Sequence, residues 1–270
     1  MLLQSRSNYY EYGDKGGRLL AHQLKRQAFS RLITQIKDPL GALLSAPSDI
    51  NVTFKTSALY QSNSQTDNTT MDRFFFFNPD VPAIDPAMGL NLDSPLVLQE
   101  IVDAISSMQS NKAPGPDGYP TEFFKKFSSE LAPLLLDVYS ESIKRGTLPP
   151  TLTQASISLL LKKDKDPTCC GSYRPLSLLN VDVKVLAKAL ATRLEAVLPD
   201  IVSKEQTGFM KGRHSFFDIR TLMNIIYSTP TSRLPEVVIS LDTEKAFDRV
   251  EWLYLFTVLK KCGSGDRFSS

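Results

Sequence analysis

One acidic residue stands where it could hold a metal ion. Asp242 follows Glu236-Val237-Val238-Ile239-Ser240-Leu241, an apolar and β-branched run that predicts a buried strand. A strand end holds a carboxylate rigidly, and carboxylate oxygen is a ligand that Mg²⁺ prefers. An aspartate at this place more often caps the following helix, so both interpretations stay open. A two-metal site also needs further carboxylates, and Asp242 alone is at best half of one.

Basic residues gather in the middle of the chain. Twelve lysines and arginines lie from Lys144 to Arg213 against six acidic residues, so this segment has a net charge of +6 and the remainder −4. A localised positive surface is typical of proteins that contact nucleic-acid phosphates. The alternative interpretation is an ordinary solvated charged face. Lys184, Lys188 and Arg193 are predicted to lie on the surface of an amphipathic helix over 183–198.

Composition excludes several classes of protein. The 270 residues are 42% hydrophobic and 22% charged, as in globular proteins. No apolar run is long enough to span a membrane, and the first residues do not resemble a signal peptide, so we expect an intracellular protein, nuclear or cytoplasmic, with no membrane partner. Cys169, Cys170 and Cys262 have neither a disulfide pattern nor a zinc-binding spacing, and no zinc is expected.

The elements that position these residues follow from periodicity. Apolar residues at four-residue steps predict an amphipathic helix within residues 19–33, part of a helical arm over 1–60. Polar and proline-rich residues predict a low-order linker over 61–93. Four consecutive phenylalanines, 74–77, interrupt this linker and are expected to dock against the next domain.

A compact domain is expected over residues 94–270. Its first helix is predicted to begin at Ser94-Pro95, with the serine as cap. Periodicity predicts a strand over 155–161 and further helices through Phe123 and Phe124 and over 131–143, 183–198, 216–227 and 245–261. The pattern therefore predicts an α+β fold.

Several motifs resemble one family. Leu241-Asp242-Thr243-Glu244-Lys245-Ala246-Phe247-Asp248-Arg249-Val250-Glu251-Trp252 resembles motif A of the reverse transcriptases encoded by non-LTR retrotransposons, the long interspersed elements. Other segments resemble further motifs of the same family and occur in the family's order. They are Ala113–Gly118, Ser172–Asn180, and Gln206–Phe209 with Gly212-Arg213. Residues 9–15 and the helix after them resemble the segment that joins the endonuclease to the polymerase.

The resemblance implies a fold, an activity and partners. The fold would be a fragment of a right-hand polymerase, with the fingers and the first part of the palm in residues 94–270, preceded by the helical arm. The activity would be that of an RNA-directed DNA polymerase, a nucleotidyltransferase that uses Mg²⁺. Its partners would be an RNA template, a DNA primer and deoxynucleoside triphosphates.

The resemblance also assigns roles to residues. Asp242 would be a catalytic carboxylate and magnesium ligand, and the backbone at Thr243 would help to hold the ion or the triphosphate. Phe247 would be the steric gate that excludes a 2′-hydroxyl, although core packing is an alternative. Lys162 and Arg174 would grip the triphosphate, unless they are only solvated charges.

A second group of residues would face the template. Gln206, Gly208 and Phe209 would lie near the template and the nascent pair, or would only connect two helices. The sequence departs from the family in containing no Asp-Asp pair. We therefore expect a truncated, unstable polypeptide that is inactive alone; the alternatives are a non-catalytic RNA-binding module and a transcribed remnant.

Overall fold

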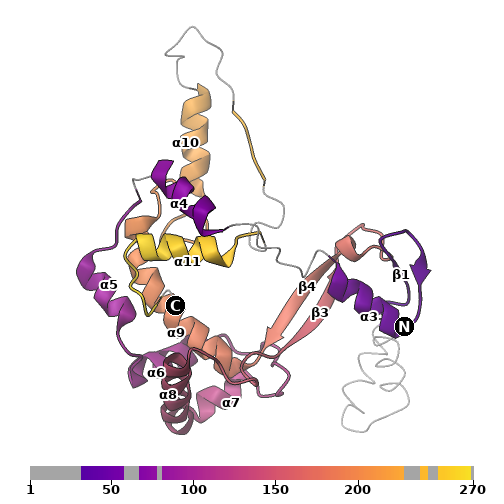
Figure 1. The fold of residues 1–270 in the computed structure, drawn as a ribbon, viewed down its shortest axis with the longest axis horizontal. Helices are drawn as coiled ribbons and strands as arrows, with labels where there is room; N and C mark the ends of the chain where they lie inside the picture. Colours follow the sequence, from indigo (N-terminus) through magenta and orange to yellow (C-terminus); the bar gives the residue numbers. More distant parts are fainter. Residues whose placement is uncertain (1–31, 58–66, 78–80, 228–237, 243–248, 269–270) are drawn as a thin grey trace, which may run out of the picture. The chain divides into compact units, whose positions relative to one another are not determined.

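The computed structural model describes residues 32–57, 67–77, 81–227, 238–242 and 249–268 (Figure 1). These residues form helices and short strands, so the mixed α and β content is confirmed. The helix predicted within 19–33 lies outside the described residues except for its last two positions, which are not helical. None of the described helices is both long and apolar enough to cross a bilayer.

The chain divides into two compact units. One consists of Met1–Gln61 and Leu159–Pro175, and the other of Ser62–Ser158 and Leu176–Ser270. The first unit therefore includes a segment that lies about a hundred residues further along the chain than its other part. Periodicity in one segment carries no information on such long-range pairing, which is why the boundary predicted near residue 94 does not coincide with this division.

A small apolar core holds the first unit together. Strands β1 (Ile36–Lys37) and β2 (Leu43–Leu44) pair antiparallel, and helix α3 (Pro47–Thr56) follows. Phe54 of α3 contacts the Tyr173 ring edge-on at 5.4 Å between centroids. The Tyr173 hydroxyl, in turn, donates a 2.7 Å hydrogen bond to the carbonyl of Pro167. One buried tyrosine thus fixes the later segment against the earlier one.

Strands β3 (Ala155–Leu161) and β4 (Tyr173–Leu179) form a two-stranded sheet, joined through the short 3₁₀ helix η1 (Cys170–Ser172). The strand predicted over 155–161 is confirmed. Strand β4 is not among the predicted elements, and it contains Pro175. A proline fits here because both strands of a two-stranded sheet are edges and need not donate every N–H.

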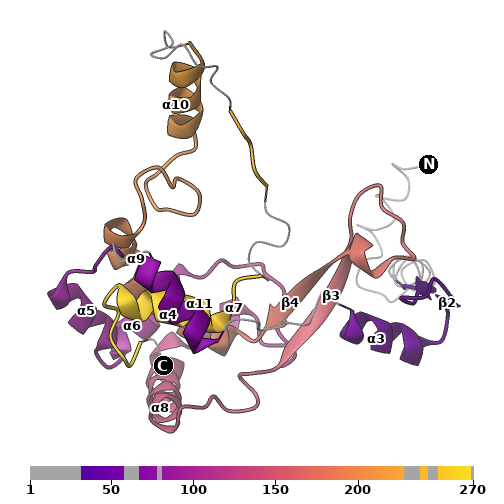
Figure 2. The same cartoon turned by 45° about the horizontal axis from the view of Figure 1, so that its top comes forward.

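Helices dominate the second unit (Figures 1 and 2). Its helices are α4 (Asn68–Phe77), α5 (Pro86–Asp93), α6 (Leu98–Ser107), α7 (Thr121–Lys126), α8 (Ser128–Arg145), α9 (Val181–Ile201), α10 (Phe216–Tyr227) and α11 (Trp252–Lys261). Helix α6 packs against α8 and α9, and its Ile101 and Ile105 are fully buried. Tyr139 of α8 joins this core and donates a 2.7 Å hydrogen bond to the Asp182 carbonyl.

The stretch expected to be a low-order linker contains two helices, α4 and α5. Asp85 caps α5 by accepting a 2.8 Å hydrogen bond from the Ala87 N–H. The phenylalanines end α4, where Phe74 lies 5.9 Å from the Tyr254 ring of α11 and the Lys261 ammonium lies over Phe75. The predicted docking is therefore confirmed, although it occurs within one unit (Figure 2).

Two predicted helix ends are wrong. Helix α6 begins at Leu98, and Ser94 instead ends α5, where its hydroxyl donates to the Asn91 carbonyl at 2.7 Å. The Glu100 carboxylate accepts a 2.9 Å hydrogen bond from the Val97 N–H, which fixes the start of α6 at Leu98. Helix α9 continues through Pro199 to its end at Ile201, since a proline removes only its own N–H from the last turn.

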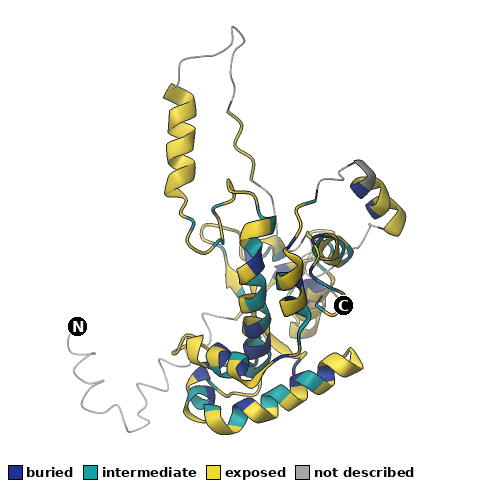
Figure 3. Ribbon diagram, turned by 90° about the vertical axis from the view of Figure 1, so that its left-hand side faces the viewer, coloured by how far each residue is buried: buried dark blue, intermediate teal, exposed yellow. Residues whose placement is uncertain are grey.

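Helix α10 occupies the predicted range, 216–227. None of its residues is buried, although eight of the twelve are apolar (Figure 3). Helix α11 begins at Trp252, seven residues later than the predicted start at 245, and residues 245–248 lie outside the described part of the chain.

Candidate functional site

Asp242 lies in an extended segment and not at the end of a buried strand. Val238, Ile239 and Leu241 are 59%, 73% and 88% exposed, and residues 238–242 pair with no described strand. The predicted buried strand is therefore wrong over these residues. A β-branched run favours a strand only when a neighbour supplies hydrogen bonds and a packing surface, and no described segment does so.

The described residues do not form a metal site around Asp242. Within them, no three histidine, cysteine, aspartate or glutamate side chains are grouped so that they could hold an ion. A single exposed carboxylate does not fit a magnesium pair. Thr243 and Phe247, predicted to contact the ion or the sugar, lie outside the described residues.

Lys162 and Arg174 lie at the end of the β3–β4 hairpin that belongs to the first unit. The Lys162 N–H donates to the Ser172 carbonyl at 2.8 Å, directly after β3, and the Lys162 ammonium donates to the Gly171 carbonyl at 2.8 Å. Arg174 lies two residues beyond Ser172 on β4 and is exposed, with no ion pair to a described residue. The hairpin thus brings both predicted triphosphate ligands to adjacent strands at the same end.

The loop that joins these strands is organised by Asp166. Its carboxylate accepts hydrogen bonds from the Thr168 hydroxyl and backbone at 2.7 and 2.8 Å, and pairs with Lys37 at 2.9 Å. The Thr168 bonds, followed by Lys37, hold the pKa of the Asp166 carboxyl well below its usual range. Strand β1 also binds the loop, because the Lys37 N–H donates a 2.7 Å hydrogen bond to the Thr168 carbonyl.

Asn180 connects two of the motifs that resemble the family. Its side-chain carbonyl accepts the Asp117 N–H at 3.2 Å, and its amide donates to the Thr151 carbonyl at 3.1 Å. Asn180 is 4% exposed, and a Cβ at Gly115 would lie within 2.6 Å of its Cα. The glycine is therefore needed for close approach, a role that its place in a Pro-Gly-Pro sequence does not reveal.

Gln206, Gly208 and Phe209 lie in one loop between α9 and α10. The Gln206 amide donates to the Gly208 carbonyl at 3.2 Å, and Phe209 is 93% exposed with a positive φ of 62°. Arg213 holds the loop by donating to the carbonyls of Ser203, Gln206 and Val202. The three predicted template residues thus lie together in one loop.

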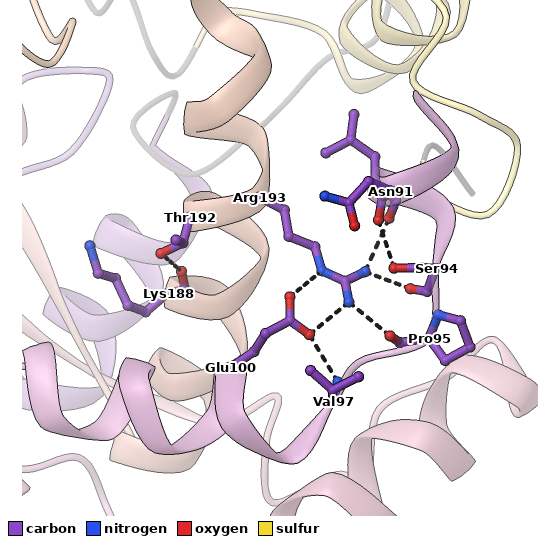
Figure 4. A network of polar contacts seen from close by, with 9 residues as sticks. Asn91, Ser94, Pro95, Val97, Glu100, Lys188, Thr192 and Arg193 are labelled. Carbon is purple, nitrogen blue, oxygen red and sulfur yellow. Dashed lines mark hydrogen bonds and ion pairs between the residues drawn. The ribbon is translucent and has the colours of Figure 1, made fainter. Parts of the chain in front are cut away.

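The predicted surface position of Arg193 is wrong (Figure 4). Its side chain is only 9% exposed. The guanidinium pairs with both Glu100 oxygens, at 2.5 and 2.7 Å, and donates to the carbonyls of Leu92, Ser94 and Pro95. Its role is structural, because it joins α9 to α6 and to the end of α5. The sequence shows only a polar residue on an amphipathic helix, which does not distinguish this role.

Comparison with known proteins identifies the relatives of this chain. Residues 160–267 match the family model described as "Reverse transcriptase (RNA-dependent DNA polymerase)". The chain is related to the reverse transcriptases of non-LTR retrotransposons. The resemblance predicted from the motifs is confirmed, and the matched residues include the end of β3, all of β4, the Gln206 loop and Asp242.

The relatives are longer proteins. The chain is 31% identical over 255 residues, 94% of its length, to the "Transposon TX1 uncharacterized 149 kDa protein" of Xenopus laevis, and covers 19% of it. It is 28% identical over 74% of its length to the Pol polyprotein of retrotransposable element R1 from Bradysia coprophila, and covers 20% of that protein. The RNA-directed DNA polymerase from mobile element jockey of Drosophila funebris is 27% identical over 67% of this chain, which spans 21% of that relative.

Proposed function

We propose that residues 94–270 are fingers and the first part of the palm of an RNA-directed DNA polymerase, preceded by a helical arm. The match of residues 160–267 to the reverse transcriptase family carries this proposal. Its substrates are deoxynucleoside triphosphates, an RNA template and a DNA primer, and its metal is magnesium. The partners follow from the family, since the chain spans about a fifth of each relative named above.

The roles of the residues follow from the resemblance of their motifs to the family. Arg174 offers a bidentate fork and Lys162 a point charge to a triphosphate, and the hairpin holds the two on adjacent strands. Gln206, Gly208 and Phe209 contact the template, and their loop is shaped by Arg213. Asp242 would be one of the several carboxylates that a magnesium pair needs, Thr243 would support the ion or triphosphate, and Phe247 would exclude a 2′-hydroxyl.

The 270-residue polypeptide by itself does not polymerise DNA. Phosphoryl transfer through two metal ions needs several fixed carboxylates, and the sequence contains no Asp-Asp pair beside Asp242. Loss of such electrostatic stabilisation lowers the rate by several orders of magnitude. Primer extension on an RNA template with Mg²⁺ tests this, comparing the polypeptide with its Asp242→Ala variant. We expect no extension from either; extension that disappears in the variant contradicts the proposed inactivity.

A non-catalytic RNA-binding module is the second candidate, and exposed cations of the hairpin favour it. Lys163, Lys165 and Arg174 are exposed and form no ion pair with a described residue. A Lys163→Gln, Lys165→Gln double variant is expected to weaken RNA binding and to flatten its salt dependence by about 0.7 per lost phosphate contact. Arg145→Gln is the matched control, because Arg145 already pairs with Glu141 at 2.8 Å. Wild-type binding that does not change with salt favours the inactive remnant instead.

A further inference from the structure

Three aromatic rings form a row at helix α7. The Tyr119 ring lies 4.8 Å from that of Phe123, and Phe123 lies 5.1 Å from Phe127, measured between centroids. Tyr119 and Phe127, at the two ends, are 51% and 43% exposed. The next ring, Phe124, is buried in the core and meets Phe123 edge-on at 5.8 Å. The middle ring of the row thus packs against the core, and the two end rings are exposed to solvent.

The loop before α7 fixes the backbone that carries the first ring of this row. The Asp117 carboxylate accepts the Tyr119 N–H at 3.1 Å, and the Asp117 N–H donates to the buried Asn180 side chain at 3.2 Å. A turn closed by the 3.1 Å bond from the Gly118 N–H to the Gly115 carbonyl completes the loop. The Tyr119 backbone is therefore held in place before any ligand arrives, which lowers the entropic cost of binding.

Three lysines lie on α7 or in the loop bound to its first turn. Lys126 lies three residues after Phe123, on the same side of α7, and Lys125 precedes it. Lys112 lies in the loop directly after Asn111, whose N–H is bound by the Glu122 carboxylate in the first turn of α7. None of the three lysines forms an ion pair with a described residue. Positive charge beside an apolar surface suits a ligand that combines flat rings with phosphates.

We propose that Tyr119, Phe123 and Phe127 form a stacking platform for the bases of single-stranded RNA, with the three lysines beside its backbone. Bases stack on aromatic side chains while basic residues follow the phosphates. The platform lies outside residues 160–267, so the family match does not assign it. It rests on the proposed RNA-binding function and adds to it a second contact, distant in sequence from the hairpin and from the Gln206 loop.

Binding of a labelled single-stranded adenine 12-mer RNA to the full chain, measured by fluorescence anisotropy over a range of salt, tests the platform. Tyr119→Ser removes one ring and is expected to weaken binding about tenfold. The salt slope stays unchanged, because no charge is lost. Tyr119→Phe keeps the ring and should bind as the wild type does. Lys126→Gln should instead flatten the salt slope. Circular dichroism melts of each variant verify that the fold is retained.

A second readout reports on stacking itself. Tyr119→Trp places an indole in the row, and its fluorescence is expected to be quenched by the adenine RNA but not by an RNA duplex, whose bases are already stacked. Equal affinities of Tyr119→Ser and the wild type overturn the platform while leaving RNA binding by the hairpin intact. Absence of RNA binding by the wild type overturns both this platform and the RNA-binding function on which it rests.

Discussion

Arg193 shows how one side chain can join three segments. A guanidinium has five N–H donors, and all five are used here, two toward Glu100 and three toward backbone carbonyls at the end of α5 and the turn after it. The Leu92 carbonyl lies in the last turn of α5, where no helical N–H follows to bind it, and the Ser94 and Pro95 carbonyls lie beyond the helix. The charge is tolerated in a nearly buried place because every donor has an acceptor.

Removal of this side chain is expected to destabilise the second unit strongly. Arg193→Met leaves the Glu100 carboxylate without its partner, and breaking a buried ion pair in this way typically costs about 3–5 kcal/mol. The free energy of unfolding, measured with urea, should fall by this amount. Lys188→Met on the exposed side of the same helix is the matched control, with an expected change within about 0.5 kcal/mol. Similar losses in the two variants would contradict the structural role of Arg193.

The same pair makes stability depend on pH. Hydrogen bonds from Arg193 lower the pKa of Glu100 from its ordinary value of 4.5. A carboxyl whose pKa is lower in the folded state contributes stability above its unfolded pKa, and this contribution is lost as pH falls through the folded pKa. Melting temperatures of the wild type should therefore fall more steeply below about pH 4.5 than those of Arg193→Met. Parallel curves for the two proteins would count against the pair.

Gly115 gives a prediction about close packing. In Gly115→Ala the new methyl group overlaps the backbone and side chain of Asn180, so both hydrogen bonds of that side chain are disturbed. Overpacking of this kind costs about 1–3 kcal/mol, measurable as a lower urea midpoint. Gly171→Ala is the control, because a Cβ there meets nothing within 4 Å. An unchanged midpoint for Gly115→Ala would show that the loop can shift at no cost.

At the scale of elements, α10 combines a correct local pattern with an uncovered surface. Its Met223 and Ile226 are 48% and 51% exposed. None of the other apolar side chains of the helix is buried either. An exposed apolar surface of this kind promotes association. We expect the polypeptide to self-associate as its concentration rises in sedimentation velocity experiments.

Charges on α10 should oppose this association. In a Met223→Lys, Ile226→Lys variant the monomer fraction is expected to rise while the unfolding midpoint changes little, because neither side chain is buried. A wild-type protein that stays monomeric over the same concentrations would contradict the prediction, and a large loss of stability in the variant would show that the helix is covered in solution.

For the whole molecule, the division into two compact units predicts two unfolding transitions. The first unit has a small core built around Phe54 and Tyr173, and the second a larger one around Ile101 and Tyr139. Small cores stabilise least, so the first unit should melt at the lower temperature. Phe54→Ala is expected to lower the free energy of unfolding of the first unit by about 3–5 kcal/mol. In differential scanning calorimetry this variant should lower the temperature of the first transition only, and Ile101→Ala should lower that of the second transition only. A single transition shifted by both variants would mean that the units unfold together.

The sequence by itself determined the local elements and the family. Apolar spacing predicted α10 and most of α9, alternation predicted β3, and the order of the motifs predicted the relationship to reverse transcriptases. These features depend on residues within a few positions of one another, because helix and strand periods are set by the local backbone. Neighbouring residues are therefore sufficient to predict them.

The tertiary structure decided which polar groups have partners. Arg193 meets Glu100 across 93 residues of chain, and Asn180 meets Asp117 across 63. The same dependence explains the wrong strand at 238–242, since an apolar run becomes a strand only beside another segment that pairs with it. Burial and pairing depend on segments distant in sequence, and no local pattern records which of them will meet.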